Sequence, residues 1–567
     1  MESIVRSSFI RPFLGACLVG CGLATSPASA QVDVTATAGT VAASYTTLKG
    51  AFDAINAGTH QGTITIDISG NTTETAPAVI NASGAGASVY TSITISPTAG
   101  AARTIAGAMA PGSPLIDFNG ADNVTIDGIN AGGRSLTLIN STASATSGTS
   151  TLRFIGGATN NVVTRSTIRG SSTSSATTNG GTIFFATDGV TANGNDDNTI
   201  SHNDIRPAGA TLHSKAIYCN GTTALGNSGV VIHDNNIFDY FHANATSAGI
   251  VTEEGCNTWT ITDNRLYQTG TRTWTSPSSL HAGMNLGDTA ATSGAQGFTI
   301  TGNVIGFASN AQTGTYTLTG TGNGAKFAGI LFNGIASGTT THVHDNTVAG
   351  VRMTGVTSNG TLQNSPFVAL FLRQGNIVSN GNTVGSPTAT GSLTFSTTTS
   401  TATDVYGIYN ASSNAWTSND NTVGGISATN TGLSVTLLVG MRAQTTSGAP
   451  PWSATGNTVG GNVAGSIGLS ALGGGSQVLG MFTNNAVAVL TSNTVRNLTS
   501  SVGTGTGGAA SVIGISVSSL GGNQTLSRNT ISNLTNTNTT AASVVIGLRF
   551  GGSIANLIER NSIHGLT

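Results

Sequence analysis

Residues 438–459 read LVGMRAQTTSGAPPWSATGNTV, and residues 478–495 read VLGMFTNNAVAVLTSNTV. Both stretches contain the same two blocks in the same order: an apolar–Gly–Met triplet and, further along, the triplet Asn-Thr-Val. Blocks that return at a nearly fixed distance are the signature of a repeat architecture, in which each repeat is one structural unit. The same two blocks should therefore recur elsewhere in the chain.

The second block, an Asn followed two residues later by an aliphatic residue, recurs from residue 203 to the end. Its asparagines are Asn203, Asn235, Asn264, Asn303, Asn346, Asn382, Asn421, Asn457, Asn493, Asn529 and Asn561. The spacing varies around a period near 36 residues, which predicts a solenoid whose turns carry loops of variable length. In stacked parallel strands, like residues lie about 4.8 Å apart, so the Asn amides can form a hydrogen-bonded ladder. Asn also tolerates the left-handed conformation of a tight turn.

The first block places an aliphatic residue or Met directly after a Gly or Ala in each repeat. These residues are Ile217, Ile250, Met284, Ile330, Leu370, Ile408, Met441, Met481, Ile515 and Leu548. We expect them to point into a core, and, because strand side chains alternate, we expect the glycine and the residue two positions after it to point outward. Each repeat thus offers three short strands: the Gly block, the segment ending at the Asn, and the Asn-x-Val/Ile segment. The Gly, Thr, Asn and Val content favours strand and turn over helix.

Composition excludes several classes of protein. Only 7% of the 567 residues are charged and the formal net charge is −2, which gives no electrostatic footprint for nucleic acid or anionic lipid. The 38% hydrophobic content and a mean hydropathy of +0.11 are too apolar for a disordered chain. No His/Cys spacing typical of a metal site occurs, and no cofactor is expected.

Residues 1–30 predict export. Arg6 and Arg11 form a basic start, an apolar run of about a dozen residues follows, and Ala28-Ser29-Ala30 is a cleavage signal. An alternative is lipoprotein processing, because residues 18–21 (LVGC) are similar to a lipobox and would place a lipid anchor on Cys21. No later segment is apolar and long enough to cross a bilayer as a helix, so we expect a secreted or bacterial cell-surface protein.

Two cysteines, Cys219 and Cys256, remain after removal of the signal. Two in so long a chain cannot form a disulfide framework, and we expect buried free thiols, although an exported protein permits a bond.

The chain resembles right-handed parallel β-helices of the pectate-lyase-like superfamily. Residues 45–56 (YTTLKGAFDAIN) have Leu48, Phe52 and Ile55 on one helical face, and the alternating strand GTITIDI (62–68) follows. In that superfamily such a helix covers the first coil. The resemblance implies an all-β solenoid of about thirteen coils, with a signal peptide at 1–30, a cap segment at 31–60 and repeats at 61–567.

The block 45–130 also resembles large secreted bacterial surface proteins. The final repeat strand is complete at Thr567, so we expect the last coil to be continued in a larger autotransported or sorted protein, or covered by a partner.

Enzymes of the superfamily suggest a polysaccharide lyase or glycoside hydrolase, but the Gly-His-Gly and Arg-x-Lys motifs of polygalacturonase-like chains are absent from this sequence. The best remaining acid–base set is Lys215, Glu253 and Arg265. Lys215 occupies a position that is apolar or aromatic in the other repeats, which predicts either a frayed strand start or partial burial with a lowered pKa. The alternative is a local ion pair.

The outward position two after the Gly carries an unusual number of aromatic and arginine side chains. They include Tyr218, Phe371, Tyr409, Arg442 and Phe482. Aromatic faces stack on sugar rings and arginine forks bind acids or hydroxyls, so this stripe predicts contact with a polysaccharide or cell-surface glycan. Loops that fold over the stripe and bury it are the alternative. The leading function from sequence is therefore a structural or adhesive surface protein, with a polysaccharide-active enzyme second.

Overall fold

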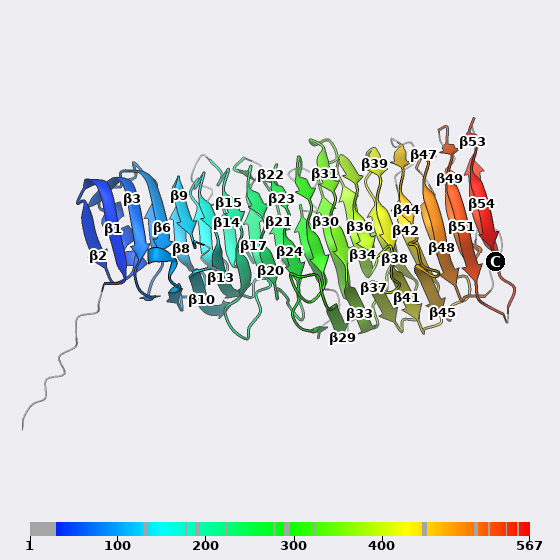
Figure 1. Cartoon of the computed structure of the whole chain (residues 1–567), viewed down its shortest axis with the longest axis horizontal. Coiled ribbons are helices and arrows are strands. Elements are labelled where there is room, and N and C mark those ends of the chain that lie inside the picture. Colours follow the sequence, from blue (N-terminus) through cyan, green and yellow to red (C-terminus); the bar gives the residue numbers. More distant parts are fainter. Residues whose placement is uncertain are drawn as a thin grey trace, which may run out of the picture.

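The computed structural model describes residues 30–567 except 130–133, 176–177, 188–192, 223, 276–278, 288–294, 321–323, 445–450, 485, 504–508, 520–521, 540 and 553–554. The molecule is a long rod in which short strands stack along the long axis, from the N-terminal coils at one end to the C-terminus at the other (Figure 1). It is an all-β parallel β-helix of about thirteen turns, which confirms the expected architecture.

Each turn contributes strands to three sheets, here called sheets A, B and C, in the chain order C, A, B. Sheet A holds the segments that end near the ladder asparagines. Its strands are β2 (Ala42–Tyr45), β1 (Val32–Gly39), β3 (His60–Ile68), β6 (Tyr90–Pro97), β9 (Val124–Asp127), β12 (Val162–Thr164), β15 (Thr199–Ser201), β19 (Val231–His233), β23 (Thr260–Thr262), β27 (Thr299–Thr301), β31 (Thr341–His344), β35 (Ile377–Asn380), β39 (Trp416–Asn419), β43 (Trp452–Thr455), β47 (Ala488–Thr491), β50 (Thr525–Ser527) and β53 (Leu557–Glu559). All these pairings are parallel except those of β1, which runs antiparallel to β2 and β3.

Sheet B holds the Asn-x-Val/Ile segments. From β24 to β45 each turn adds two strands to it, in two lanes that meet at β48. Its strands are β4 (Thr72–Glu74), β7 (Arg103–Gly107), β10 (Leu136–Ser144), β13 (Ser166–Ser172), β16 (Asp204–Pro207), β20 (Asn236–Phe238), β24 (Arg265–Tyr267), β25 (Arg272–Trp274), β28 (Val304–Gly306), β29 (Tyr316–Gly320), β32 (Thr347–Ala349), β33 (Val351–Val356), β36 (Thr383–Gly385), β37 (Leu393–Thr397), β40 (Thr422–Gly424), β41 (Ile426–Asn430), β44 (Thr458–Val459), β45 (Ile467–Ala471), β48 (Thr494–Ser500), β51 (Thr530–Asn536) and β54 (Ser562–Leu566).

Sheet C is formed by the Gly blocks. Its 14 strands are β5 (Ala78–Asn81), β8 (Pro114–Asn119), β11 (Ser150–Ile155), β14 (Ile183–Ala186), β17 (Lys215–Asn220), β21 (Ser247–Thr252), β26 (Leu280–Leu286), β30 (Lys326–Asn333), β34 (Phe367–Gln374), β38 (Thr403–Asn410), β42 (Thr436–Ala443), β46 (Gln477–Thr483), β49 (Val512–Ser519) and β52 (Val545–Gly552). A separate pair joins β18 (Asn227–Ser228) to β22 (Cys256–Asn257), and the short 3-10 turns are η1 (Thr98–Gly100) and η2 (Leu362–Asn364).

The helix expected near the N-terminus is α1 (Leu48–Asn56). It buries Leu48, Phe52 and Ile55, and the Thr47 hydroxyl caps its first turn by accepting the Gly50 N–H at 3.1 Å. Its role as a lid on the first coil stays a prediction. With nine residues, α1 is the longest helix in the described part of the chain and falls far short of the roughly 20 residues that a bilayer span needs.

The interior is filled by the aliphatic residues that follow the glycines, as expected, but the predicted direction of the glycines is wrong. In β38, Tyr406 and Tyr409 pack in the outer cluster while Ile408 packs in the core. A Cβ on Gly407 would lie 2.7 Å from Val423 Cγ1, a core atom of sheet B. Gly407 and Ile408 therefore both face the interior at the bend of the strand. The strict alternation of side chains between the two faces of the sheet does not hold at this point. Glycine fits this bend because the facing aliphatic side chain occupies the space of a Cβ.

The predicted asparagine ladder is present along its full length. From Asn203 to Asn529, each ladder residue donates its backbone N–H and one Nδ2–H to the Oδ1 of the next, at 2.9–3.1 Å. Each also donates an Nδ2–H to a carbonyl of the preceding turn, as Asn421 does to Ser379. The left-handed residue of the turn is the one before the Asn, such as Asp420, and not the Asn itself.

Cys219 and Cys256 form a disulfide, so the expectation of free thiols is wrong. Their separation of 37 residues is close to one period, which places them on neighbouring turns, and both are fully buried. The two cysteines can bond because the repeat places them on neighbouring turns. The number of cysteines in the chain carries no information about this proximity.

The two ends of the chain leave earlier expectations open. The described residues begin at Ala30, so the predicted signal peptide and a lipid anchor at Cys21 lie outside them. On the last turn, Leu557, Ile558, Ile563 and Leu566 are 38–48% exposed. Continuation or capping of this turn stays a prediction.

Candidate functional site

The outer face of sheet C is the part of the surface where the sequence placed both candidate sites. Most of this face is covered, and its side chains form a second hydrophobic cluster separate from the core. Tyr218 and Tyr409 are fully buried there, and Phe371 is 5% exposed. The side chains form a mostly buried cluster on this outer face, as in the alternative to an open sugar-stacking platform.

Arg442 shows how this stack is held together. Its guanidinium lies 4.8 Å from the Phe482 ring centroid and 5.7 Å from that of Tyr409, and it donates to the Tyr406 hydroxyl. Desolvated cation–π contacts of this kind stabilise by about 2 kcal/mol. Asp404 faces the same group, at 3.9 Å from Arg442. Of the five predicted ligand-binding residues, Phe482 alone is partly exposed.

Lys215 lies at the start of β17, on the outer face. Its Nζ sits 3.9 Å from the centroid of the Tyr218 ring and donates to the Thr178 carbonyl at 3.1 Å. Burial lowers the pKa of Lys215 to about 8, and the charge of Glu253 partly opposes this shift. Of the two alternatives expected for Lys215, the structure has the buried side chain and not a frayed strand start.

Glu253 follows β21 on the next turn. The Tyr218 hydroxyl lies 2.7 Å from Glu253 Oε2 and 2.8 Å from Asn179 Oδ1, and donates to one of them at a time. Tyr218 thus connects the cation of Lys215, held over its ring, to the carboxylate of Glu253. Arg265 is not part of this arrangement. It begins β24 in sheet B, and its guanidinium contacts backbone carbonyls such as that of Gly302.

The outer face remains open along one groove. Three adjoining hollows of about 210, 170 and 230 Å³ share Arg373, and together they run from Lys215 and Glu253 to Ala411. We call this feature the sheet C groove. It crosses β17, β21, β26, β30 and β34 and ends at Ala411, just after β38; these strands pair side by side in this order (Figure 1). Five strand spacings give it a length of about 24 Å.

Positive charge is concentrated in this groove. The chain contains three lysines, and two of them, Lys215 and Lys326, line it together with Arg373. Lys326 donates to Asn364 at 3.1 Å, and burial together with Arg373 lowers its pKa. Glu253 is the acidic residue among the lining side chains.

Sequence reasoning missed Arg373, although the repeat register could have found it. Glu253 stands four residues after Gly249, and Arg373 stands four residues after Ala369, which occupies the equivalent position in its own repeat. Reading this column through every repeat would have placed Asn220, Glu253 and Arg373 on the same outer lane.

A second group of titratable side chains lies inside the solenoid. His281 bonds to the Ser247 hydroxyl at 2.8 Å and to the Tyr316 hydroxyl, and burial lowers its pKa to about 3. Both His281 and Ser247 are fully buried, and neither lines the sheet C groove, so this Ser–His pair has no access to substrate there. It satisfies polar groups inside the core.

No family model and no curated protein matches the chain. Among solved structures, PfbA, a surface adhesin of Streptococcus pneumoniae, is 12% identical with a TM-score of 0.31, covering 70% of this chain and 86% of its own. The mannuronan C-5 epimerase AlgE6 A-module of Azotobacter vinelandii is 11% identical with a TM-score of 0.29, covering 91% and 94%. A double mutant of the periplasmic alginate epimerase AlgG is 9% identical with a TM-score of 0.24, covering 98% and 100%. These values are too low to transfer a site or an activity.

Proposed function

We propose that this protein is an exported β-helix that binds a stretch of acidic polysaccharide in the sheet C groove. The observation that carries the proposal is the placement of Lys215, Lys326 and Arg373 along one continuous groove. In a chain with 7% charged residues, three cations against one carboxylate make a strong local preference for anions. Arg373 binds a carboxylate or sulfate through its guanidinium fork, and the lysines act as point charges.

Export is supported by the disulfide between Cys219 and Cys256, because such bonds persist in oxidising compartments. The basic start, apolar run and cleavage signal in residues 1–30 support it independently. Both observations favour a surface-attached or secreted location, and an adhesive role would use the groove as its contact site.

A second candidate function is a lyase acting on the same polysaccharide. It is favoured by Lys215, whose pKa of about 8 leaves a fraction of neutral amine near pH 7 that can accept a proton. In this scheme Arg373, rather than the predicted Arg265, neutralises the uronate carboxylate.

Binding of polyuronate and of its neutral counterpart, measured by calorimetry, tests the first proposal. Lys326→Ala and Arg373→Ala should each weaken polyuronate binding about tenfold. Lys49→Ala is the matched control, since Lys49 is the third lysine and pairs with Asp53 on α1, away from the groove. Absence of polyuronate binding, or equal losses in all three variants, would refute the proposal.

Turnover separates the two functions. Release of an unsaturated uronate, followed by its ultraviolet absorbance, that disappears in Lys215→Ala would establish the lyase. Binding without any such product would leave the adhesive function and exclude β-elimination.

A further inference from the structure

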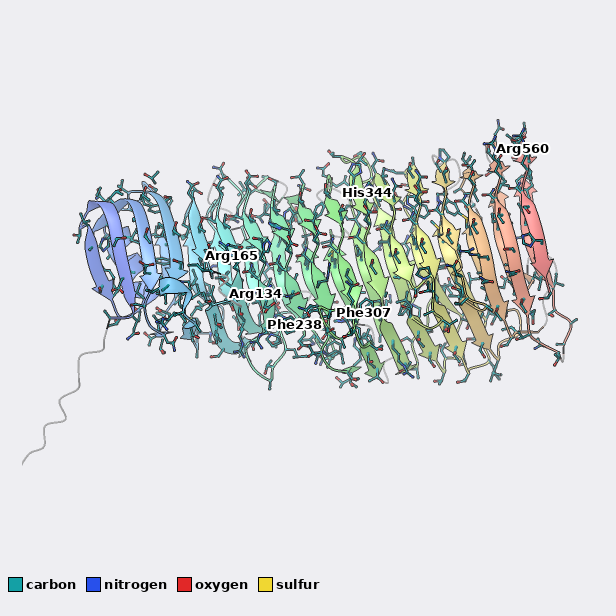
Figure 2. All side chains as sticks on the ribbon, in the orientation of Figure 1. Arg134, Arg165, Phe238, Phe307, His344 and Arg560 are labelled. Carbon is teal, nitrogen blue, oxygen red and sulfur yellow. A yellow bond between two sulfur atoms is a disulfide. The ribbon has the colours of Figure 1, made fainter. Side chains whose placement is uncertain are left out.

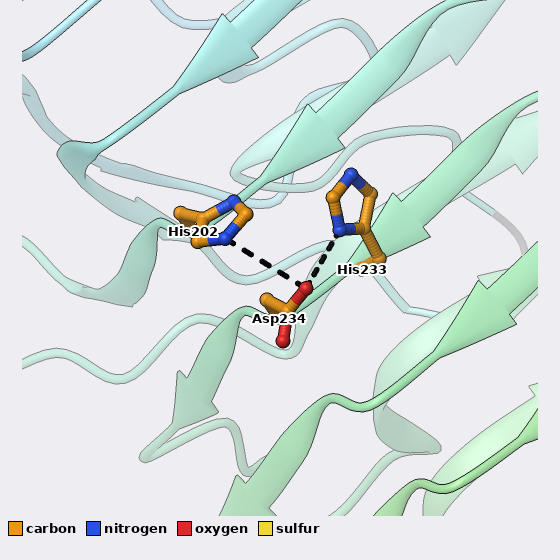
Figure 3. A group of neighbouring side chains, drawn as sticks. All are labelled: His202, His233 and Asp234. Carbon is orange, nitrogen blue, oxygen red and sulfur yellow. Dashed lines mark hydrogen bonds and ion pairs between the residues drawn. The ribbon is translucent and has the colours of Figure 1, made fainter.

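We propose that His202, His233 and Asp234 form a binding site for a divalent transition-metal ion that bridges two successive turns. The site lies on the turn between sheets A and B and is independent of the sheet C groove. Figure 3 shows the two imidazoles on either side of the Asp234 carboxylate, both facing the same oxygen. That oxygen, Oδ2, lies 2.8 Å from His233 Nδ1 and 3.7 Å from His202 Nε2.

The distances fit a metal polyhedron. Ligand atoms about 2.1 Å from a tetrahedral ion lie about 3.4 Å from each other. The two measured separations fall on either side of that value, and all three ligand atoms lie within 4.8 Å of one another. Side-chain movements of less than about 1 Å therefore place an ion between them. The side chains are 30–52% exposed, so water can occupy the fourth position.

The backbone beneath the site is rigid. His202 and Asp234 both hold the left-handed conformation directly before a ladder asparagine. The His202 N–H donates to the His233 carbonyl at 3.1 Å, which fixes the two turns at hydrogen-bonding distance. Because the ladder holds these backbones, metal binding orders side chains alone, and little conformational entropy opposes it.

The ligand chemistry selects the class of ion. Two imidazoles and one carboxylate suit Zn²⁺, Cu²⁺ or Ni²⁺, whereas Ca²⁺ and Mg²⁺ prefer all-oxygen sites. Two cations lie near the site, Arg134 and Arg165 (Figure 2). Arg134 donates to the His202 carbonyl at 2.6 Å and pairs with Asp204, and Arg165 pairs with Asp127. Each of these positive charges is therefore balanced by a carboxylate outside the proposed ligand set. Asp263 follows Asp234 on the next turn and adds negative charge.

The chain contains its own internal control. The triplet His-Asp-Asn occurs at 233–235 and again at 344–346, and His344 stands in the same lane of sheet A (Figure 2). On the turn before the second triplet, Gly302 takes the place that His202 takes before the first. The second triplet thus lacks the ligand from the preceding turn. The His342 ring lies 5.2 Å from that of His344, but the ligand atoms of His342, His344 and Asp345 do not all lie within 4.8 Å of one another as those of the first group do.

Calorimetric titration of the tag-free, chelator-treated protein with Zn²⁺ tests the site. We expect one tight Zn²⁺ per chain, at least about tenfold weaker binding in His202→Ala and in Asp234→Asn, and unchanged binding in His344→Ala. Tetrahedral absorption bands with Co²⁺ should appear in the wild type and be lost in His202→Ala.

Absence of Zn²⁺ binding, unchanged affinity in His202→Ala, or loss of the site in His344→Ala would overturn the proposal. Circular-dichroism melting without metal checks that the variants are folded. Asp234→Asn keeps the shape of the side chain and therefore tests the ligand even if removal of His202 disturbs the turn.

Discussion

Replacing Asn421 by Ala should destabilise the protein far more than replacing a neighbouring Asn outside the ladder. Asn421 Oδ1 accepts the backbone N–H of Asn382 at 3.0 Å and its Nδ2–H at 2.9 Å. Its own Nδ2 donates to the Ser379 carbonyl and to Asn457 Oδ1, each at 2.9 Å. The substitution removes four hydrogen bonds at a fully buried position.

The magnitude follows from the groups left behind. The backbone N–H of Asn382 and the carbonyl of Ser379 lose this partner. The Nδ2 of Asn382 keeps the Val343 and Asn380 carbonyls, and Asn457 Oδ1 keeps the backbone N–H of residue 421. Each buried group without a partner costs about 1–3 kcal/mol, so the loss for two such groups should be about 2–6 kcal/mol. Asn419→Ala is the control. The half-buried Asn419 accepts one N–H, from Thr455 at 3.1 Å, and its loss should cost about 0.5–1 kcal/mol.

Guanidinium unfolding followed by circular dichroism measures both losses. Hydrogen exchange gives a local readout, because the Asn382 amide loses its acceptor and should exchange much faster in Asn421→Ala. If Asn421→Ala costs no more than Asn419→Ala, or if the Asn382 amide stays protected, the ladder does not stabilise the turns in the way described.

Three further predictions concern the bend, the disulfide and the buried lysine. Gly440→Ala should cost about 1–3 kcal/mol of unfolding free energy, because the new Cβ would lie 2.3 Å from a core valine methyl, whereas Gly468→Ala, with its nearest atom 3.6 Å away, should be nearly neutral. Thermal melts of both variants compare them directly. Replacing Cys219 and Cys256 by Ser together should cost up to about 4 kcal/mol in the chain-entropy model for a 37-residue separation, and the reductant sensitivity of the wild-type melt should vanish in this variant. Burial lowers the folded-state pKa of Lys215 to about 8 from the 10.5 of an exposed lysine, so the unfolded chain binds more protons between those values. Stability should therefore rise from pH 8 to 10.5, and the rise should be smaller in Lys215→Met; an unchanged pH profile in that variant would contradict the assignment.

The repeat predicted much of the fold because it fixes register. Asn457 and Asn493 stack because both precede the same strand type, and their spacing is visible in the sequence. The direction of the glycines was not predictable from alternation. The bend at Gly440 depends on the methyl of Val459 on another sheet, which is a tertiary contact.

Part of the candidate site was also predictable from the register of the repeat. Lys215 and Glu253 could be placed because each stands at a fixed offset from its own glycine or alanine, and the lowered pKa of Lys215 follows from that position. The separation of Arg265 from them was missed. Closeness in the sequence suggested that Arg265 belongs with Lys215 and Glu253. In a solenoid such closeness does not imply contact, because residues twelve apart, such as Glu253 and Arg265, lie beside different sheets.

The course of the connecting segments decides where such a solenoid can carry a site. The strands repeat, so every turn offers nearly the same sheet surface, and the connections determine whether that surface is covered. The turn from Asn235 to Asn264 has 29 residues and contains β21, whose Val251 lines the groove together with Glu253 just after the strand. The groove also crosses β26 and β30, on turns of 39 and 43 residues, so the length of a turn alone does not open the outer face. Around Arg442, by contrast, the same face is closed, and its aromatic side chains are buried in contact with one another. Function in this fold is thus positioned by the irregular segments, and the repeat supplies the fixed backbone on which their charges are held.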